Sequence, residues 1–170
     1  MRILVACVGN IFLGDDGFGS AVAHELAERA LPAGVHLEDY GIRSVHLVYE
    51  LLDGYDLLVL VDTVGRQEGE PGTLYVIEPD LGVGPVGPDG PEAPMLDPHD
   101  LPPGGALELV PTLGGHVDRI LVVGVQPASL EEGIGLSASV AGAVRPAADL
   151  VLDVVGRELA RTETGEGVSR

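Results

Sequence analysis

The residues best suited to chemistry lie in a glycine-rich turn near the start of the chain. Residues 9–19 read GNIFLGDDGFG, and the glycines let the backbone bend sharply and leave the carboxylates of Asp15 and Asp16 accessible. The glycine spacing matches neither the dinucleotide-binding nor the P-loop pattern, and all nine basic residues of the chain are arginine. A phosphate site is therefore disfavoured. Two interpretations stay open, a cation site and a helix cap.

Two further aspartates follow apolar runs that are typical of buried strands. Asp39 lies near the end of residues 35–40, and Asp62 ends residues 56–62, the clearest strand pattern in the chain. The carboxyl ends of parallel strands share one edge of a sheet, where ligands usually bind. We therefore expect Asp16, Asp39 and Asp62 to converge there although they are far apart in sequence.

One histidine is placed to join these carboxylates. His99 lies in a long segment, residues 79–105, that is rich in proline and glycine, and long loops of this kind are often functional. Two carboxylates and an imidazole suit a borderline divalent cation such as zinc, nickel or manganese. The alternative interpretation is that His99 is an exposed polar residue. His24, His36 and His46 are expected to be solvated or hydrogen-bonded, and His116 is a minor candidate.

The elements that must position these residues alternate between strand and helix. Apolar patterns predict strands at 3–8, 35–40, 56–62, 72–77 and 119–125, and helices at 18–30, 45–52, 106–113 and 140–155. This alternation predicts an α/β fold, a three-layer, doubly wound and mainly parallel sheet with helices on both faces. We expect a single domain over residues 1–160 and a polar tail over 161–170. Pro146 should kink the last helix or mark its start.

Composition excludes several classes of function. A net charge of −18 over 170 residues argues against binding nucleic acid or anionic membranes. No apolar run reaches the length of a membrane span, and the N-terminus lacks a signal pattern, so we expect a cytoplasmic protein. The single cysteine, Cys7, excludes an internal disulfide and is expected to be a buried, inert thiol.

Familiar hydrolase motifs are absent, with one partial exception. The sequence contains neither a Gly-x-Ser-x-Gly elbow nor a His-Glu-x-x-His pair. Residues 61–65 read VDTVG, which is similar to an aspartic-protease segment. That chemistry needs two carboxylates that share a proton, and Asp16 and Asp62 are the candidates for such a pair.

Several blocks, in order along nearly the whole chain, carry a resemblance to a known family. Residues 9–19 resemble the N-terminal signature of the hydrogenase maturation endopeptidases. The resemblance continues with Val61-Asp62, with Pro98-His99, and with residues 123–127 and 135–137. Each block is weak alone, but the set is specific. Where many relatives have Gly-Gly-Thr after the second strand, this chain has YGIRS at residues 40–44, a segment linked with substrate choice in the family.

The resemblance implies a fold, a reaction and a set of site residues. Family members have a flavodoxin-like (phosphorylase/hydrolase-like) sheet and remove a short C-terminal extension from the large-subunit precursor of nickel–iron hydrogenases after nickel insertion. It implies that Asp16, Asp62 and His99 contact the nickel carried by the substrate. From this we infer that Asp16, Asp62 and Asp39 are the catalytic residues, with Asp39 orienting the peptide or a water, and we expect a monomer.

Two alternatives from other classes stay open. A non-catalytic metal-binding adaptor or metallochaperone in hydrogenase assembly would need the same ligands without cleavage. A flavin- or nucleotide-binding module on the same fold is disfavoured by the acidic turn.

Overall fold

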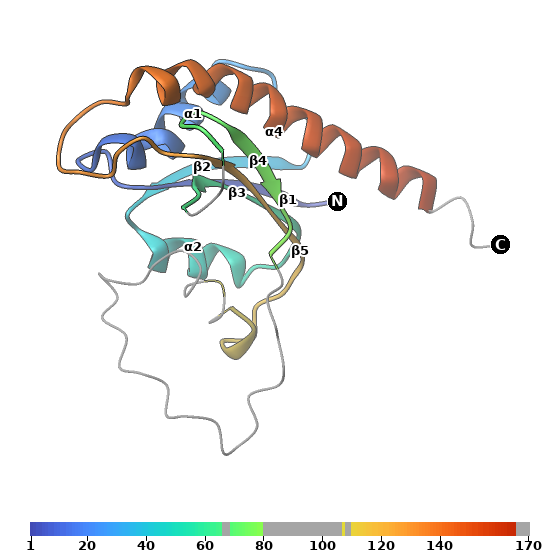
Figure 1. The fold of residues 1–170 in the computed structure, drawn as a ribbon. Helices are drawn as coiled ribbons and strands as arrows, with labels where there is room; N and C mark the ends of the chain where they lie inside the picture. Colours follow the sequence, from blue (N-terminus) through green and yellow to red (C-terminus); the bar gives the residue numbers. More distant parts are fainter. Residues whose placement is uncertain (66–68, 80–106, 108–109, 166–170) are drawn as a thin grey trace.

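The computed structural model describes residues 1–65, 69–79, 107 and 110–165, and within them a five-stranded sheet forms the centre of the molecule (Figure 1). The strand order is β2-β1-β3-β5-β4. The strands are β1 (Ile3–Val8), β2 (Val35–Gly41), β3 (Tyr55–Thr63), β4 (Leu74–Ile77) and β5 (Val117–Val125). The helices are the 3₁₀ helix η1 (Gly14–Gly17), α1 (Phe18–Ala27), α2 (Ser44–Leu51) and α4 (Ala138–Gly165).

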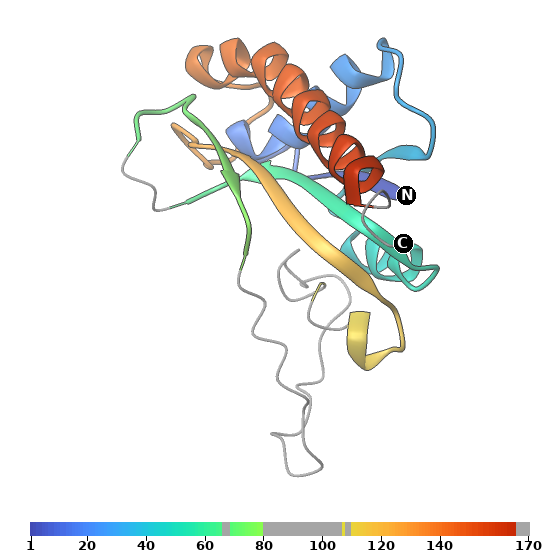
Figure 2. The same ribbon diagram turned by 90° about the vertical axis from the view of Figure 1, so that its right-hand side faces the viewer.

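Helices cover both faces of the sheet. Helices α1 and α4 lie on one face and α2 lies on the other, as two views at right angles show (Figures 1 and 2). Strands β1, β2, β3 and β5 are parallel, whereas β4 pairs antiparallel to β5 at one edge. The prediction of a three-layer, mainly parallel α/β fold is confirmed. Among the helices described, none is long and apolar enough to cross a membrane.

The core lies on both sides of β1, whose six residues are all buried. Ile3, Val5 and Cys7 face α1 and α4, while the alternate residues of the strand face α2. Burial on both faces explains why this strand reads as a continuous apolar run rather than an alternating one. Burial also raises the pKa of the Cys7 thiol, so the expected inert cysteine is confirmed.

The register of the parallel strands brings the predicted carboxylates to one edge. Cys7 of β1 pairs with Asp39 of β2 and with Val61 of β3, so Asp62 lies one residue beyond this level. Residues that are distant in sequence therefore share the carboxyl end of the sheet, because parallel pairing aligns the strand ends.

The last helix differs from its prediction at both ends. Helix α4 runs without interruption from Ala138 to Gly165 and contains Pro146, so the prediction that the helix starts at this proline is wrong. Pro146 cannot bond to the carbonyl of Gly142, but both residues are exposed, and water can satisfy that carbonyl. The helix also extends beyond residue 161, where a polar tail was expected.

The close contact of α1 with the sheet depends on Gly19. A Cβ atom at this position would lie 2.1 Å from the carbonyl oxygen of Val8 and 3.0 Å from that of Val61. Both atoms belong to core strands that cannot move without disturbing the sheet. We expect Gly19→Ala to lower the free energy of unfolding by about 3 kcal/mol or more, measured by urea denaturation.

Gly156 provides the matched control. It is exposed within α4, and a Cβ atom there would meet no atom within 4 Å. Gly156→Ala should raise the free energy of unfolding by about 0.5–1 kcal/mol, since alanine favours the helix. Equal effects of the two substitutions would contradict this account of the packing.

Candidate functional site

Asp16 lies at the carboxyl end of β1 and connects the glycine-rich turn to β3. The backbone N–H of Asn10 donates to Asp16 Oδ2 at 2.7 Å, and the hydroxyl of Thr63 donates to Asp16 Oδ1 at 3.1 Å. The turn requires glycine at position 9, where φ is 134° and a Cβ atom would lie 1.9 Å from the carbonyl oxygen of Asp16. The Asp16 carboxylate is thus held in one orientation at the sheet edge.

Asp62 lies beside Asp16, at the end of β3. Its Oδ1 accepts the backbone N–H of Thr63 at 2.7 Å. Burial raises the pKa of Asp62 to about 7, with a further contribution from the charge of Asp16. The pair therefore holds a carboxyl group that exchanges a proton near neutral pH. A cation between the two groups would favour the ionised form of Asp62 and relieve the repulsion.

Asp39 lies on β2, next to β1, and its described hydrogen bonds are with residues other than Asp16 and Asp62. Its Oδ1 accepts the hydroxyl of Ser20 at 3.1 Å and the N–H of Gly41 at 3.0 Å. These bonds tie the end of β2 to α1 and to the turn that follows it. The structure brings Asp16 and Asp62 together, and it leaves Asp39 at the same edge with one carboxylate oxygen free of described hydrogen bonds.

His99 lies outside the described residues, so its place in the site stays a prediction. Within the part of the chain that the structure describes, no three His, Cys, Asp or Glu side chains are grouped to hold a metal ion. The described residues include Asp16 and Asp62, and the prediction that they bind a metal with His99 stays a prediction. Two of the remaining histidines have protein partners, since His24 Nδ1 lies 2.8 Å from the carbonyl oxygen of Ser20 and His116 contacts Asp118.

The other carboxylate of the turn, Asp15, has a structural role that the sequence did not indicate. Asp15 is 1% exposed, so the expectation that it is accessible is wrong. Its carboxylate accepts the N–H groups of Ala128 (2.8 Å), Ser129 (3.1 Å) and Ser137 (2.7 Å), and the Ser137 hydroxyl (3.0 Å). The helix-cap interpretation is also wrong, because Leu13 and Gly17 occupy the cap positions of η1 and α1.

Asp15 therefore joins the turn after β1 to the segment after β5. Three backbone hydrogen bonds reinforce the junction, from Gly14 N–H to Gly133 O at 2.9 Å, from Asp15 N–H to Ser129 O at 3.1 Å and from Gly133 N–H to Phe12 O at 2.8 Å. Ser137 was among the residues that carried the family resemblance, but the periodicity of a sequence does not show which carboxylate such a residue bonds. Of the two adjacent aspartates in this turn, Asp15 and Asp16, only Asp16 remains available to a ligand.

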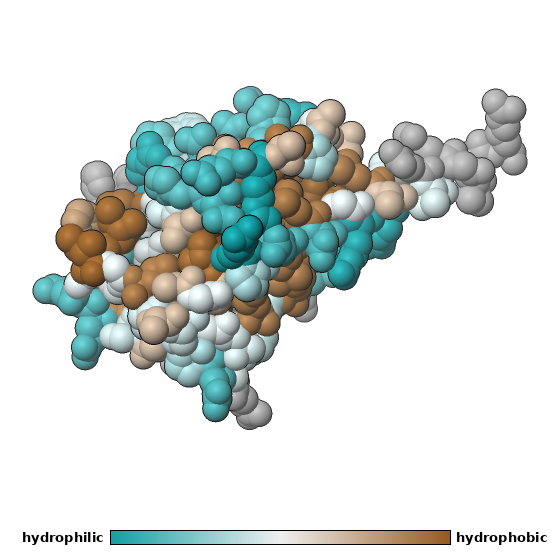
Figure 3. Space-filling model, turned by 90° about the horizontal axis from the view of Figure 1, so that it is seen from above, coloured by the Kyte–Doolittle hydropathy of each residue, from teal (hydrophilic) through white to brown (hydrophobic). Residues whose placement is uncertain are grey.

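The joined segments also form an apolar surface beside the carboxylates. Large apolar side chains are exposed in both segments, namely Ile11, Phe12, Leu130 and Ile134. Figure 3 shows hydrophobic surface gathered at this end of the molecule, on the left of the view. Exposed apolar patches of this kind often mark protein–protein contacts.

The hydrogen bonds of Asp15 generate a prediction for stability. Burial acts to raise the pKa of Asp15, but the hydrogen bonds from Ser137, Ser129 and Ala128 outweigh it, and the pKa lies below its usual value. We expect Asp15→Asn to lower the free energy of unfolding at pH 7 by about 2–4 kcal/mol, because an amide offers a single acceptor oxygen to four donors.

The sign of the pH dependence follows from the lowered pKa. The stabilisation is present above the usual aspartate pKa, about 3.9, and is lost as the pH falls through the folded-state value. The difference between wild type and Asp15→Asn in urea denaturation should therefore shrink in acid. Asp153→Asn, an exposed position on α4, is the control, and equal losses for both substitutions would contradict the assignment.

Asp62 should show the opposite dependence. Its raised pKa means that folding is disfavoured as the pH rises from about 4 to about 7, since the buried carboxyl must then ionise. We expect Asp62→Asn to be more stable than wild type by about 1–3 kcal/mol at pH 8 and equal to it at pH 4. Urea denaturation at the two pH values measures this, and a stability gain that is independent of pH would be inconsistent with the ionisation.

The chain is similar to known proteins over most of its length. The family model described as hydrogenase maturation protease matches residues 20–154. The hydrogenase 2 maturation protease of Escherichia coli strain K12 is 31% identical over 158 residues, which cover 89% of each chain. A solved hydrogenase maturating endopeptidase from E. coli has a TM-score of 0.74 and 29% identity, over 93% of this chain and 94% of that chain.

A second solved structure extends the comparison to archaea. The hydrogenase 2 maturation peptidase of a Thaumarchaeota archaeon has a TM-score of 0.67 and 31% identity, over 92% of this chain and 99% of that chain. The expected relationship is confirmed for the fold and for the class of enzyme. The chain belongs to the hydrogenase maturation protease family and is a peptide-bond hydrolase.

Proposed function

We propose that this protease removes the C-terminal extension of a nickel–iron hydrogenase large-subunit precursor after nickel has been inserted. The observation that carries the proposal is the adjacency of Asp16 and Asp62 at the sheet edge of a chain in this family. Asp16 and Asp62 are held in place, and Asp62 has a pKa of about 7, so a divalent cation between them would stabilise the ionised form of both carboxylates. The cation in this proposal arrives with the substrate as part of the precursor.

In the proposed mechanism, the nickel of the precursor is the recognition element. Asp16, Asp62 and His99 bind it and so hold the adjacent peptide bond against the sheet edge. Binding displaces the proton from Asp62, because a cation favours the ionised carboxylate. A precursor without nickel leaves the two carboxylates repelling each other, and the peptide is then not positioned.

The hydrolytic step needs a nucleophile and a proton acceptor. Either a carboxylate of the pair or a water polarised by the metal attacks the peptide carbonyl, and a carboxylate that titrates near pH 7 can accept the proton. Asp39 lies at the same edge, and we assign it to orienting the peptide or the water. The sheet edge thus provides the binding and proton-transfer groups of an aspartyl-type hydrolase.

The surroundings of the site favour a protein substrate. The apolar surface formed by Ile11, Phe12, Leu130 and Ile134 lies on the segments next to Asp16, and a folded precursor could bury it. The adaptor alternative needs metal binding without hydrolysis, and membership of a protease family argues against it. We propose in addition that the enzyme acts in the cytoplasm as a monomer.

The test is a cleavage assay with the precursor. Asp16→Asn, Asp62→Asn and His99→Ala should each lower kcat/KM for the nickel-loaded precursor about a hundredfold or more, because each removes a group that positions the scissile bond. Cleavage is read as the mass lost from the precursor. Circular dichroism and urea denaturation of each variant confirm that it is folded.

Two controls make the assay decisive. His24→Ala changes an exposed histidine on α1 and should leave the rate unchanged. Precursor that lacks nickel should not be cleaved by the wild-type enzyme. Normal processing by Asp16→Asn and His99→Ala, or equal cleavage of precursor with and without nickel, would refute the mechanism.

A further inference from the structure

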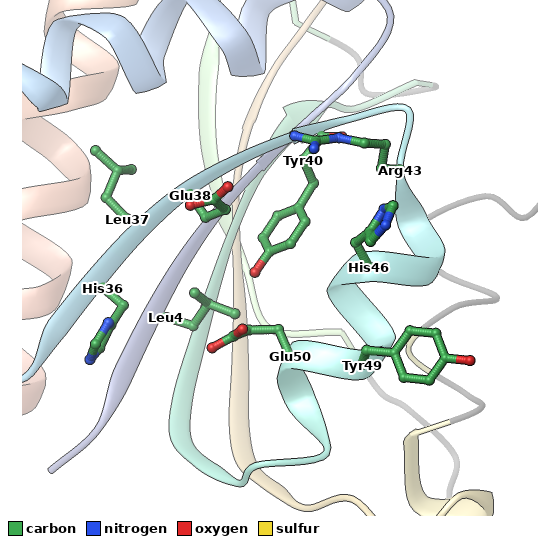
Figure 4. Close-up of a pocket in the computed structure, with 9 residues that line it drawn as sticks. All are labelled: Leu4, His36, Leu37, Glu38, Tyr40, Arg43, His46, Tyr49 and Glu50. Atoms are coloured by element: carbon green, nitrogen blue, oxygen red, sulfur yellow. The ribbon is translucent and has the colours of Figure 1, made fainter.

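A second feature of the molecule, separate from the carboxylate pair, is a groove between β2 and α2. Its volume is about 550 Å³, and it is lined by side chains from both elements (Figure 4). The groove exists because the buried residues of α2, Leu47, Val48 and Leu51, pack on the central strands. On the same face of the edge strand β2, His36 and Glu38 remain exposed.

Tyr40 is the residue that marks this groove as a binding site. It is 5% exposed, yet its hydroxyl has no hydrogen-bond partner among the described residues. Figure 4 shows the ring directed into the groove, with its hydroxyl on the side where the carboxylates of Glu38 and Glu50 lie. Burial, followed by the charges of Glu50 and Glu38, raises the pKa of Tyr40. The ring is buried while the hydroxyl reaches the groove, where a ligand or water can bond to it.

The charges around the hydroxyl indicate the sign of the ligand. Glu38 makes no described hydrogen bond, and Glu50 uses one oxygen to accept the hydroxyl of Tyr55. Arg43 also lines the groove, and it donates to the carbonyl oxygens of Asp39 at 2.7 Å and Tyr40 at 3.2 Å, which orients its guanidinium and leaves its positive charge in place. The carboxylates of Glu50 and Glu38 nevertheless outweigh the single charge of Arg43 at the Tyr40 hydroxyl, so the groove is acidic there. An ammonium or guanidinium group can donate to both carboxylates and to the Tyr40 hydroxyl at once.

The backbone of β2 indicates that the cation belongs to an extended peptide. Within the described sheet, β2 pairs with β1 alone, so its other side is open. The Asp39 carbonyl points to this open side, where it accepts from Arg43, and Leu37 has the same orientation two residues earlier. An added strand can therefore bond to β2 while a side chain enters the groove.

We propose that this groove binds an extended segment of the protein substrate through a lysine or arginine side chain. The proposal builds on the function proposed above, and it assigns Tyr40, Glu38 and Glu50 to substrate binding rather than to hydrolysis. Strand β2 ends at Asp39–Gly41, at the same edge of the sheet as Asp16 and Asp62. A segment bound along β2 thus leads toward the carboxylate pair.

Kinetics with the nickel-loaded precursor test this assignment. Tyr40→Phe and Glu38→Gln should each raise KM about fivefold and leave kcat unchanged, since each removes one contact made equally before and during the reaction. Tyr75→Phe on β4, at the opposite edge of the sheet, and Glu28→Gln at the end of α1 are the matched controls. A KM within twofold of wild type for both groove variants would overturn the proposal.

A binding experiment separates failure of this proposal from failure of the proposed function. The probe is a synthetic decapeptide of alternating lysine and threonine, titrated into the wild-type protein and followed by backbone amide chemical shifts. We expect shifts in β2 and α2, loss of binding in Glu38→Gln, and weaker binding at high salt. A peptide with glutamate in place of lysine should not bind.

The two experiments have distinct negative outcomes. If the wild-type enzyme cleaves no precursor, the function proposed above fails, and the peptide titration alone decides whether the groove binds a cationic strand. If the glutamate peptide binds as well as the lysine peptide, or if shifts occur away from β2 and α2, the groove does not select a cationic segment. Tyr40→Phe removes an unpartnered hydroxyl, so its urea denaturation should match or exceed that of wild type.

Discussion

The burial of one carboxyl group beside a second carboxylate is the constraint on which this structure depends. Asp16 and Asp62 meet at the ends of β1 and β3, and the pKa of about 7 at Asp62 records the cost of burying a second negative charge there. Hydrogen bonds from Asn10 and Thr63 hold the groups in place. Such a pair lowers the free energy of unfolding, so the rest of the molecule must offset its cost. Carboxyl groups with raised pKa values are common at functional sites.

The supporting stability comes from the residue next to Asp16. Asp15 has nearly the same sequence surroundings, but it is buried and accepts four hydrogen bonds from the segment after β5. Adjacent carboxylates in one turn thus have opposite roles. One, bonded to donors on all sides, anchors the turn, and the other remains at the sheet edge. The four donors around Asp15 lower the pKa of its carboxyl group despite its burial.

The arrangement of the sheet also explains how a large substrate can reach the carboxylates. The segments anchored by Asp15 expose apolar side chains such as Phe12 and Ile134 on one side of the edge. On the other side, α2 leaves one face of β2 uncovered, and the acidic groove around Tyr40 lies there. An apolar surface and a polar groove flanking one pair of carboxylates suit a protein substrate that presents both a folded part and an extended segment.

The sequence by itself determined the elements and their order. Unbroken apolar runs such as residues 56–62 require burial on both faces, and their alternation with helical patterns leaves a parallel sheet as the solution. Parallel pairing then places Asp16, Asp39 and Asp62 at one edge. The sequence therefore indicates these carboxylates, and it indicates the family because the blocks from Gly9 to Ser137 are specific when taken together.

Only the tertiary structure decided what each carboxylate does. Asp15 and Asp16 are the same residue type in the same turn, and the hydrogen bonds that separate them come from residues more than a hundred positions away. The antiparallel pairing of β4 and the uncovered face of β2 depend likewise on which neighbours the strands meet. Local pattern determines which surfaces of an element are apolar. The donors, acceptors and charges that surround a side chain are supplied by distant segments, and they set its pKa and its role.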